Sequence, residues 1–256
     1  MAWKEIHRLR WKKGLSPAQS IAIAFAVIIL IGTILLSLPA ASRTGEAHSV
    51  VDALMAATSA TCVTGLTRFD TWSQWTGFGQ TVIICLIQVG GLGFMSIATM
   101  VVFLLRRKVG LKQRMVMAQA LSVSDMDGIV RLQKWVLVGS FSIEALGALI
   151  LTLRFFPEFG WATAVKWGVF HSISAFCNAG FDLFGQLSPG TSLTVFQSDP
   201  VVLLTLSGLV IIGGLGFLVW QDLVLSRRFQ KLSVYTRLVL LTTLALLTLG
   251  MVLIAL

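Results

Sequence analysis

Long apolar stretches, separated by short polar and charged segments, are the dominant pattern along this chain. Five of them approach or exceed the roughly 20 residues of helix that cross a hydrocarbon core about 30 Å thick. They are residues 21–38, about 78–105, about 135–156, about 201–219 and 238–256. The pattern therefore predicts an all-α integral membrane protein.

Two further apolar stretches, about 49–67 and about 161–182, lie between predicted spans. Each is too apolar for an ordinary loop and too short to cross a membrane, and each reads as a short helix followed by a stretch rich in small residues. Irregular backbone at membrane depth is tolerated only where it is buried in protein or lines a watery cavity. We therefore expect two re-entrant pore loops that enter and leave the membrane on the same side.

The sequence also contains an internal repeat. Ser, Ala, Cys and Gly recur between residues 58–66 and 173–181 at a constant offset of 115, and Gly-Gly-Leu-Gly-Phe at 90–94 recurs at 213–217. The chain thus reads as two copies of span, re-entrant segment, span, followed by one more span. Both copies begin on the same side, so they are parallel repeats with a symmetry axis along the membrane normal, and we expect a pore on that axis.

Composition and charge exclude several classes. Hydrophobic residues make up 56% of the chain and charged residues 12%, whereas soluble domains carry about 25% charged residues. A disordered chain, a disulfide scaffold and an ordinary soluble enzyme are therefore excluded. Sixteen of the 20 Lys and Arg residues lie on one side of the predicted spans, and the others are Arg43, Arg68, Arg154 and Lys166. The net charge of +9 thus sets topology, with a cytoplasmic N-terminus, and does not indicate nucleic acid.

The tryptophans agree with this topology, because all eight fall near a predicted membrane interface, as an aromatic belt requires. They are Trp3, Trp11, Trp72, Trp75, Trp135, Trp161, Trp167 and Trp220.

The stretches that follow the two short helices are suited to binding a dehydrated cation. Gly65 and Gly180 permit a positive φ, which can aim successive carbonyl oxygens in one direction, and rings of such oxygens replace the hydration shell of K⁺. A short helix would also point its negative end at the cavity. The alternative is a glycine-containing turn at a helix end. We name the two stretches the first and second candidate filter segments: Thr61, Cys62, Val63, Thr64 and Gly65, and Phe176, Cys177, Asn178, Ala179 and Gly180.

Three acids could attract cations. Asp70 and Asp182 fall in the mildly acidic outer segments, and Glu144 lies within the third predicted span. Intramembrane carboxylates usually face a partner or a cavity, so Glu144 is either a cavity-facing cation attractor or a hydrogen-bonded helix contact. His171, on the second short helix, is a protonation site or a packed, satisfied histidine. The spacing of His and Cys fits no bound metal and no disulfide.

These motifs resemble a known superfamily. TSATCVTGLT at 58–67 and ISAFCNAGFDLF at 173–184 are similar to the first two filter segments of Ktr-type potassium uptake proteins, which belong to the Trk/Ktr/HKT superfamily. The resemblance implies four membrane–pore–membrane repeats around one pore, with one filter glycine per repeat and a preference for K⁺. It also implies a homodimer in membrane lipid, gated by a cytoplasmic nucleotide-binding ring, with no bound cofactor and with Na⁺ as an ion that could be coupled.

Only two of the four expected repeats are present. We expect a cytoplasmic segment at 1–17, a first repeat at 18–110, a cytoplasmic connection at 111–130, a second repeat at 131–225 and the start of a truncated third repeat at 226–256. Half a filter cannot encircle an ion. The sequence therefore predicts a potassium-translocating subunit of the plasma membrane, as an incomplete chain. A non-conducting structural or regulatory half-subunit is the alternative, and a membrane enzyme is disfavoured because no paired catalytic groups occur.

A basic run between the two repeats is either a lipid-facing basic cuff or a candidate docking surface for the cytoplasmic regulator. The simpler alternative is an ordinary loop that obeys the positive-inside rule. The run contains Arg106, Arg107, Lys108, Lys112 and Arg114.

Overall fold

The computed structural model describes residues 17–93, 129–226, 230 and 232–255. The described parts are helical, and their one extended pairing is an isolated antiparallel bridge between Ser42 and Trp75. The basic run at 106–114 lies outside the described residues.

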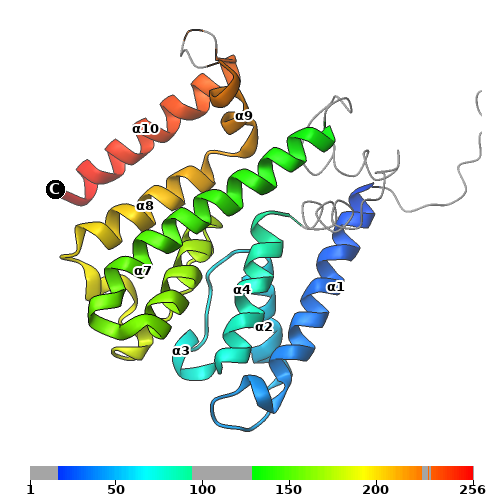
Figure 1. Cartoon of the computed structure of the whole chain (residues 1–256). Coiled ribbons are helices and arrows are strands. Elements are labelled where there is room, and N and C mark those ends of the chain that lie inside the picture. Colours follow the sequence, from blue (N-terminus) through cyan, green and yellow to red (C-terminus); the bar gives the residue numbers. More distant parts are fainter. Residues whose placement is uncertain (1–16, 94–128, 227–229, 231, 256) are drawn as a thin grey trace, which may run out of the picture.

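The first repeat packs a short helix between two longer ones. Its elements are α1 (Pro17–Ser37), η2 (Pro39–Ala41), α2 (Val50–Thr61), α3 (Thr71–Gln74) and α4 (Gly77–Gly91). Helix α2 contacts both α1 and α4 (Figure 1). Side-chain caps define where these helices begin, because Ser49 accepts a hydrogen bond from the Val51 amide and Thr76 accepts one from the Gly79 amide. Such caps satisfy amides that the first turn leaves unpaired.

The second repeat is built around a broken helix. Its elements are α7 (Ile129–Phe176), η3 (Phe184–Gln186), η4 (Ser192–Phe196), α8 (Pro200–Gly214) and α9 (Phe217–Ser226), and α10 (Val234–Ala255) follows. Pro157 and the non-helical Gly160, with φ of 73° and ψ of 167°, interrupt α7. The part after the break turns back toward the middle of the molecule (Figure 1). This part is the short helix that the sequence predicted after residue 161.

Helix lengths confirm a membrane protein and correct two predicted spans. Three described helices are long and apolar enough to cross a membrane: Ala18–Ser37, Gln133–Phe176 and Val234–Ile254. The prediction of one continuous helix over 201–219 is wrong, because Pro200–Gly214 and Phe217–Val224 meet at 94°. The predicted span 78–105 is also interrupted, since α4 ends at Gly91, and the rest of that span after residue 93 is not described.

The same physical cause produces both interruptions. Gly93 and Gly216, the third glycines of the two Gly-Gly-Leu-Gly-Phe blocks, have φ of 78° and 88°. A left-handed residue ends an α-helix, and glycine adopts that conformation without steric cost.

One apolar core joins the two repeats. It combines Leu36 and Ile83 of the first repeat with Phe155, Trp167 and Phe184 of the second. The aromatic-belt prediction fails for Trp75 and Trp167, which are only 2% and 0% exposed. Both tryptophans belong to this core. Around the second short helix, Phe155 and Phe184 pack edge to face against Trp167.

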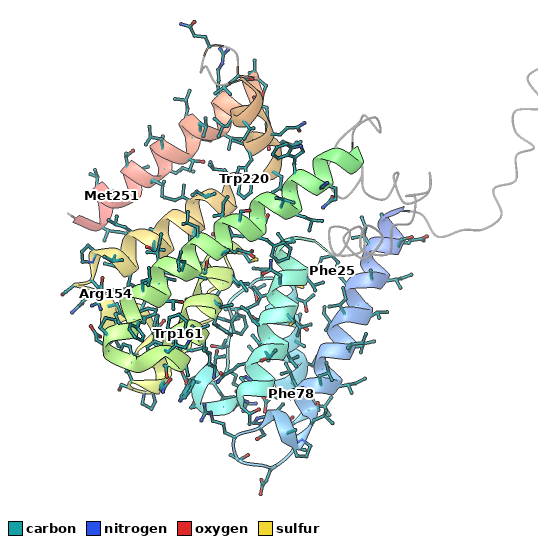
Figure 2. The ribbon with its side chains drawn as sticks, in the orientation of Figure 1. Phe25, Phe78, Arg154, Trp161, Trp220 and Met251 are labelled. Carbon is teal, nitrogen blue, oxygen red and sulfur yellow. The ribbon has the colours of Figure 1, made fainter. Side chains whose placement is uncertain are left out.

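Helices α1 and α10 lie at opposite edges of the molecule (Figure 1). Many large apolar side chains of α10 are exposed, and Met251, near the C-terminal end of this helix (Figure 2), is 72% exposed. Apolar faces of this size are suited to lipid or to further protein.

Candidate functional site

The two candidate filter segments have the same backbone conformation at matching positions. Val63 and Asn178 are left-handed, with φ of 56° and 59°, and two residues later Gly65 and Gly180 have φ of 72° and 73°. Each segment begins at the C-terminal end of a short helix, α2 or the second part of α7. The unpaired carbonyls and the negative dipole end of each helix therefore lie where a segment starts.

Matching hydrogen bonds hold these turns. The Thr64 amide donates to the Ser59 carbonyl at 3.0 Å, and the Ala179 amide donates to the Ser174 carbonyl at 2.7 Å. The two serines also act through their hydroxyls: that of Ser59 lies 2.9 Å from the Thr64 hydroxyl, and that of Ser174 donates to the Phe181 carbonyl at 2.6 Å. The serines were seen in the sequence only as part of the repeat, and the structure adds their role in fixing the turns.

The two segments lie against each other although 115 positions separate them in sequence. A Cβ atom built on Gly65 would be 2.6 Å from the carbonyl oxygen of Ala179, and one built on Gly180 would be 3.6 Å from the Cα of Gly65. Thr64, Asn178 and Gly180 are exposed. The structure thus brings the two candidate filter segments into contact at Gly65, Ala179 and Gly180.

Close glycine contacts position each segment. A Cβ on Gly90 of α4 would overlap the carbonyl of Thr61, and a Cβ on Gly213 of α8 would overlap the carbonyl of Phe176. A Cβ on Gly91 would overlap the side chain of Cys177, in the other repeat. The glycines therefore allow α4 and α8 to pack directly against the C-terminal ends of the two short helices. Small residues permit such close packing of helices, but the sequence does not show which backbone they contact.

The structure places Asp70 and Asp182 near each other and gives each a local role. Asp70 caps α3 by accepting the Ser73 amide at 2.7 Å, and a Cβ on Gly185 would overlap its carboxylate. Asp182 accepts the Phe184 amide at 3.0 Å and the Ser192 hydroxyl at 2.7 Å. Burial raises the pKa of Asp182, these two hydrogen bonds oppose the rise, and the charge of Asp70 adds to it.

Glu144 makes a helix-to-helix contact between the repeats. It is 4% exposed, and the Gln88 side-chain amide of α4 donates to its two carboxylate oxygens at 3.0 and 2.9 Å. Its backbone carbonyl also accepts the Ser172 hydroxyl at 2.7 Å. Of the two interpretations of this carboxylate, the geometry favours the hydrogen-bonded contact.

A double-mutant cycle should show how far the stability of the fold depends on the hydrogen bonds between Gln88 and Glu144. Gln88→Leu leaves a buried carboxylate without its donor, so we expect it to cost about 1.5–3 kcal/mol of stability. Adding Glu144→Leu should recover most of that loss, because both polar groups are then removed together. Thermal unfolding of the detergent-purified variants measures both values. A double variant that is less stable than Gln88→Leu alone would contradict this account.

His171 is a packed histidine. Its side chain is 3% exposed, the Leu183 amide donates to Nε2 at 3.1 Å, and the imidazole stacks on Phe184 at 4.0 Å. Because Nε2 accepts, the proton is on Nδ1, which donates to the Trp167 carbonyl at 2.7 Å. Both ring nitrogens are satisfied in the neutral form, so the imidazole ties the loop after the second segment to its helix.

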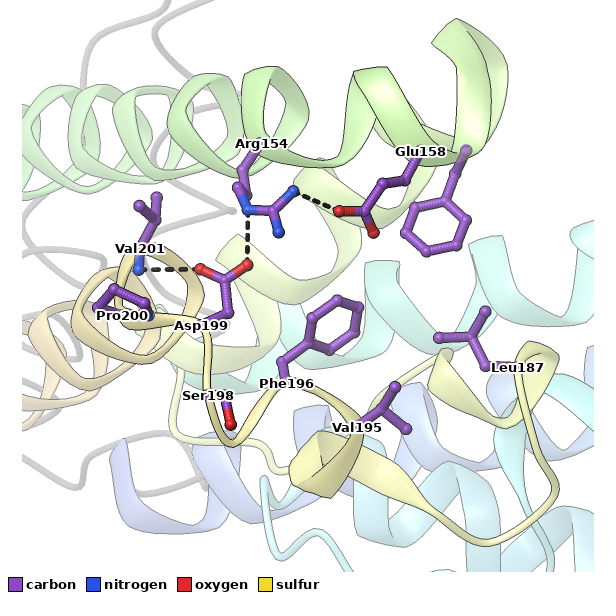
Figure 3. A pocket seen from close by; sticks show the side chains of 10 residues that line it. Arg154, Glu158, Leu187, Val195, Phe196, Ser198, Asp199, Pro200 and Val201 are labelled. Carbon is purple, nitrogen blue, oxygen red and sulfur yellow. Dashed lines mark hydrogen bonds and ion pairs between the residues drawn. The ribbon is translucent and has the colours of Figure 1, made fainter.

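Arg154, just before the break in α7, connects this helix to the start of α8 through ion pairs. It pairs with Glu158 at 2.8 Å and with Asp199 at 2.6 Å, and Asp199 in turn caps α8 through the Val201 amide. Figure 3 shows this arrangement at a pocket of about 470 Å³. The pocket lies outside both candidate filter segments, and its arginine is already neutralised by two carboxylates.

No group of three or more His, Cys, Asp or Glu side chains that could hold a metal ion occurs within the described ranges. Cys62, Cys85 and Cys177 are free thiols. The two candidate filter segments consist of backbone carbonyls, hydroxyls, the Cys62 and Cys177 thiols and close glycine contacts, groups that can bind and orient a small ion.

Comparison with known proteins identifies the family. Residues 7–256 match the model of the TrkH family, described as cation transport protein. The chain is 41% identical over 97% of its length to the potassium/sodium uptake protein NtpJ of Enterococcus hirae, covering 54% of that protein. It is 44% identical over 93% of its length to the Ktr system potassium uptake protein B of Bacillus subtilis, covering 52%. The corresponding Vibrio alginolyticus protein is 39% identical over 91%, with 50% covered.

The chain spans about half the length of these relatives. The matched residues, 7–256, nevertheless include both repeats, both candidate filter segments and the residues that follow the second repeat. With its apolar helices, this establishes an all-α multi-pass membrane protein of a transport family and not an enzyme. The chain belongs to the TrkH family of cation transport proteins.

Proposed function

We propose that this chain supplies two of the four filter segments of a potassium uptake pore. The observation that carries the proposal is the contact between the first and second candidate filter segments, which share left-handed positions and matching hydrogen bonds. Such backbone can present carbonyl oxygens to a dehydrated cation. Relatives named for potassium, or potassium and sodium, uptake support this choice of ion.

The geometry also supports the way in which the pore is built. Residues 18–110 and 131–225 form the two membrane–pore–membrane repeats, and 226–256 begin a third. Residues 49–67 and 161–182 are re-entrant from the outer side, so that the short helices point their negative ends inward. Two further segments complete the ring of oxygens, because two segments alone cannot encircle an ion.

The outer acids and the inner basic run have separate roles in this proposal. Asp70 and Asp182 add negative charge near the outer entrance, which raises the local concentration of cations. The run at 106–114 docks a cytoplasmic nucleotide-binding ring, and two such subunits form a dimer in the plasma membrane. Na⁺ is the candidate coupled ion, and no cofactor is needed, because transport requires only exchange of water for carbonyl oxygens.

Uptake by cells tests the proposal. The chain, expressed within its native reading frame in a bacterium that lacks its own potassium uptake systems, should restore growth at low external K⁺ and take up radioactive rubidium. Sodium at equal concentration should compete poorly. Protein that reaches the membrane in normal amount without supporting rubidium uptake would reject the proposed function.

A further inference from the structure

Two outer cations share one tryptophan at the junction of the repeats. The Arg43 guanidinium lies 4.2 Å and the Lys166 ammonium 4.6 Å from the centre of the Trp72 ring. Arg43 follows α1, Trp72 belongs to α3, and Lys166 lies in the second part of α7. Arg43 is also held by a hydrogen bond from its Nε to the Trp75 carbonyl at 3.1 Å. The cluster is therefore fixed by both repeats.

These two cations differ from the other outer cations because no carboxylate pairs with them in the described part of the chain. Arg68 pairs with Asp52 at 2.5 Å, and Arg154 is held by two acids. The acid nearest in sequence to Trp72, Asp70, is engaged by the Ser73 amide and lies against Gly185.

Like charges around one ring repel each other, and the attraction of each cation to the indole face offsets that repulsion only in part. The arrangement therefore favours an anion that contacts Arg43 and Lys166 together. A phosphate group meets this need, since guanidinium and ammonium groups are its usual partners in proteins.

The position of the cluster favours a lipid as the source of that phosphate, and this step rests on the membrane orientation of the proposed function. Trp161, at the outer start of the second part of α7, is 63% exposed. Lys166 lies five residues further along this helix, about 7–8 Å deeper at 1.5 Å per residue. Val169, on the same side of the helix, is 42% exposed and apolar. Lysine beside apolar surface at this depth extends its charge to the headgroup layer, where tryptophan also concentrates.

We propose that Arg43, Trp72 and Lys166 form a site for the phosphate of an anionic phospholipid in the outer leaflet. The headgroup phosphate neutralises the two cations, and the acyl chains lie along the apolar surface beside Val169. Because the cluster draws on both repeats, the bound lipid stabilises their junction.

Native mass spectrometry of the purified chain, in an uncharged detergent and titrated with phosphatidylglycerol, tests the site without requiring transport. Arg43→Gln and Lys166→Gln should each weaken binding about fivefold, because a cation near an anionic lipid contributes about 1 kcal/mol. Arg43→Lys should retain most of the affinity, since it keeps the charge. Arg68→Gln is the matched control, and it should bind phosphatidylglycerol like the unchanged chain because its cation already has a carboxylate partner.

Three results would overturn the proposal: unchanged binding in both Gln variants, equal loss in Arg68→Gln, or equally tight binding of uncharged-headgroup phosphatidylcholine. Displacement of the lipid by inorganic phosphate at the same concentration would assign the site to a free anion instead. Circular dichroism of each variant separates lost binding from lost folding. A chain that binds phosphatidylglycerol as expected but fails in rubidium uptake would reject the proposed function and leave the lipid site standing.

Discussion

Gly65→Ala is expected to reduce potassium uptake by roughly tenfold or more. The residue is left-handed, with φ of 72°, and alanine in that conformation costs about 1–2 kcal/mol. In addition, the new methyl group would lie 2.6 Å from the Ala179 carbonyl oxygen, so one candidate filter segment must move away from the other. In the proposed pore, a displaced carbonyl would no longer replace a water of the ion. Initial rates of rubidium uptake, normalised to protein in the membrane, measure the effect.

Two other glycines separate backbone strain from this contact. Gly180 has nearly the same φ, 73°, but the nearest atom to its Cβ position is the Cα of Gly65 at 3.6 Å, an ordinary distance. Gly45 has a φ of 74° and nothing within 4 Å of its Cβ position. All three alanines introduce similar backbone strain, but only residues 65 and 180 lie in candidate filter segments, and only residue 65 adds the close contact. The loss of uptake should therefore be largest in Gly65→Ala, smaller in Gly180→Ala, and close to zero in Gly45→Ala. Equal uptake in Gly65→Ala and Gly45→Ala would show that the contact between the segments does not matter.

Gly213→Ala is expected to destabilise the fold, whereas Gly208→Ala in the same helix should not. The methyl group at residue 213 would overlap the carbonyl of Phe176, while nothing lies within 4 Å of the Cβ position at residue 208. Overpacking costs typically about 1–3 kcal/mol, and backbone atoms at a helix end cannot rotate away as a side chain can. At residue 208, alanine should instead add about 0.5–1 kcal/mol, because it favours the helix over the unfolded chain.

Thermal unfolding in detergent, followed as the fraction of protein that remains monodisperse, compares the pair. The two substitutions should shift the midpoint in opposite directions. Gly90→Ala, at the matching place in the first repeat, should behave like Gly213→Ala, because its methyl group would overlap the Thr61 carbonyl. Similar midpoints for Gly213→Ala and Gly208→Ala would disprove the close contact between α8 and the second short helix.

Much of the helical architecture could be predicted from the sequence. Apolar length alone located α1 and α10, and the repeated Ser-Ala-x-Cys block located both short helices and the loops that follow them. Hydrophobic length identifies helices in this way because the backbone of a membrane segment must satisfy its own hydrogen bonds. The same signal misled at the Gly-Gly-Leu-Gly-Phe blocks, which are apolar throughout but end their helices at a left-handed glycine.

The roles of single polar residues could be predicted only in part from the sequence. Glu144 and His171 were each open to two interpretations, because a sequence names a polar side chain without naming its partners. The Gln88 side chain, 56 positions from Glu144, and the Leu183 amide, 12 positions from His171, favour the hydrogen-bonded interpretation in both cases. Trp75 and Trp167 were expected at the membrane interface, but they pack in the core, since hydropathy cannot distinguish an interfacial tryptophan from a buried one.

The sequence by itself determined the membrane class and displayed the recurring blocks at fixed offsets, because these depend on local composition and residue identity. The ten candidate filter residues are a prediction from that recurrence. Only the tertiary structure decided that Gly65 meets Gly180, that Gly90 and Gly213 press against the ends of the short helices, and that Arg43 and Lys166 share Trp72. Those contacts join residues about 30 to 120 positions apart. They arise from packing between helices, which the order of residues along the chain does not display.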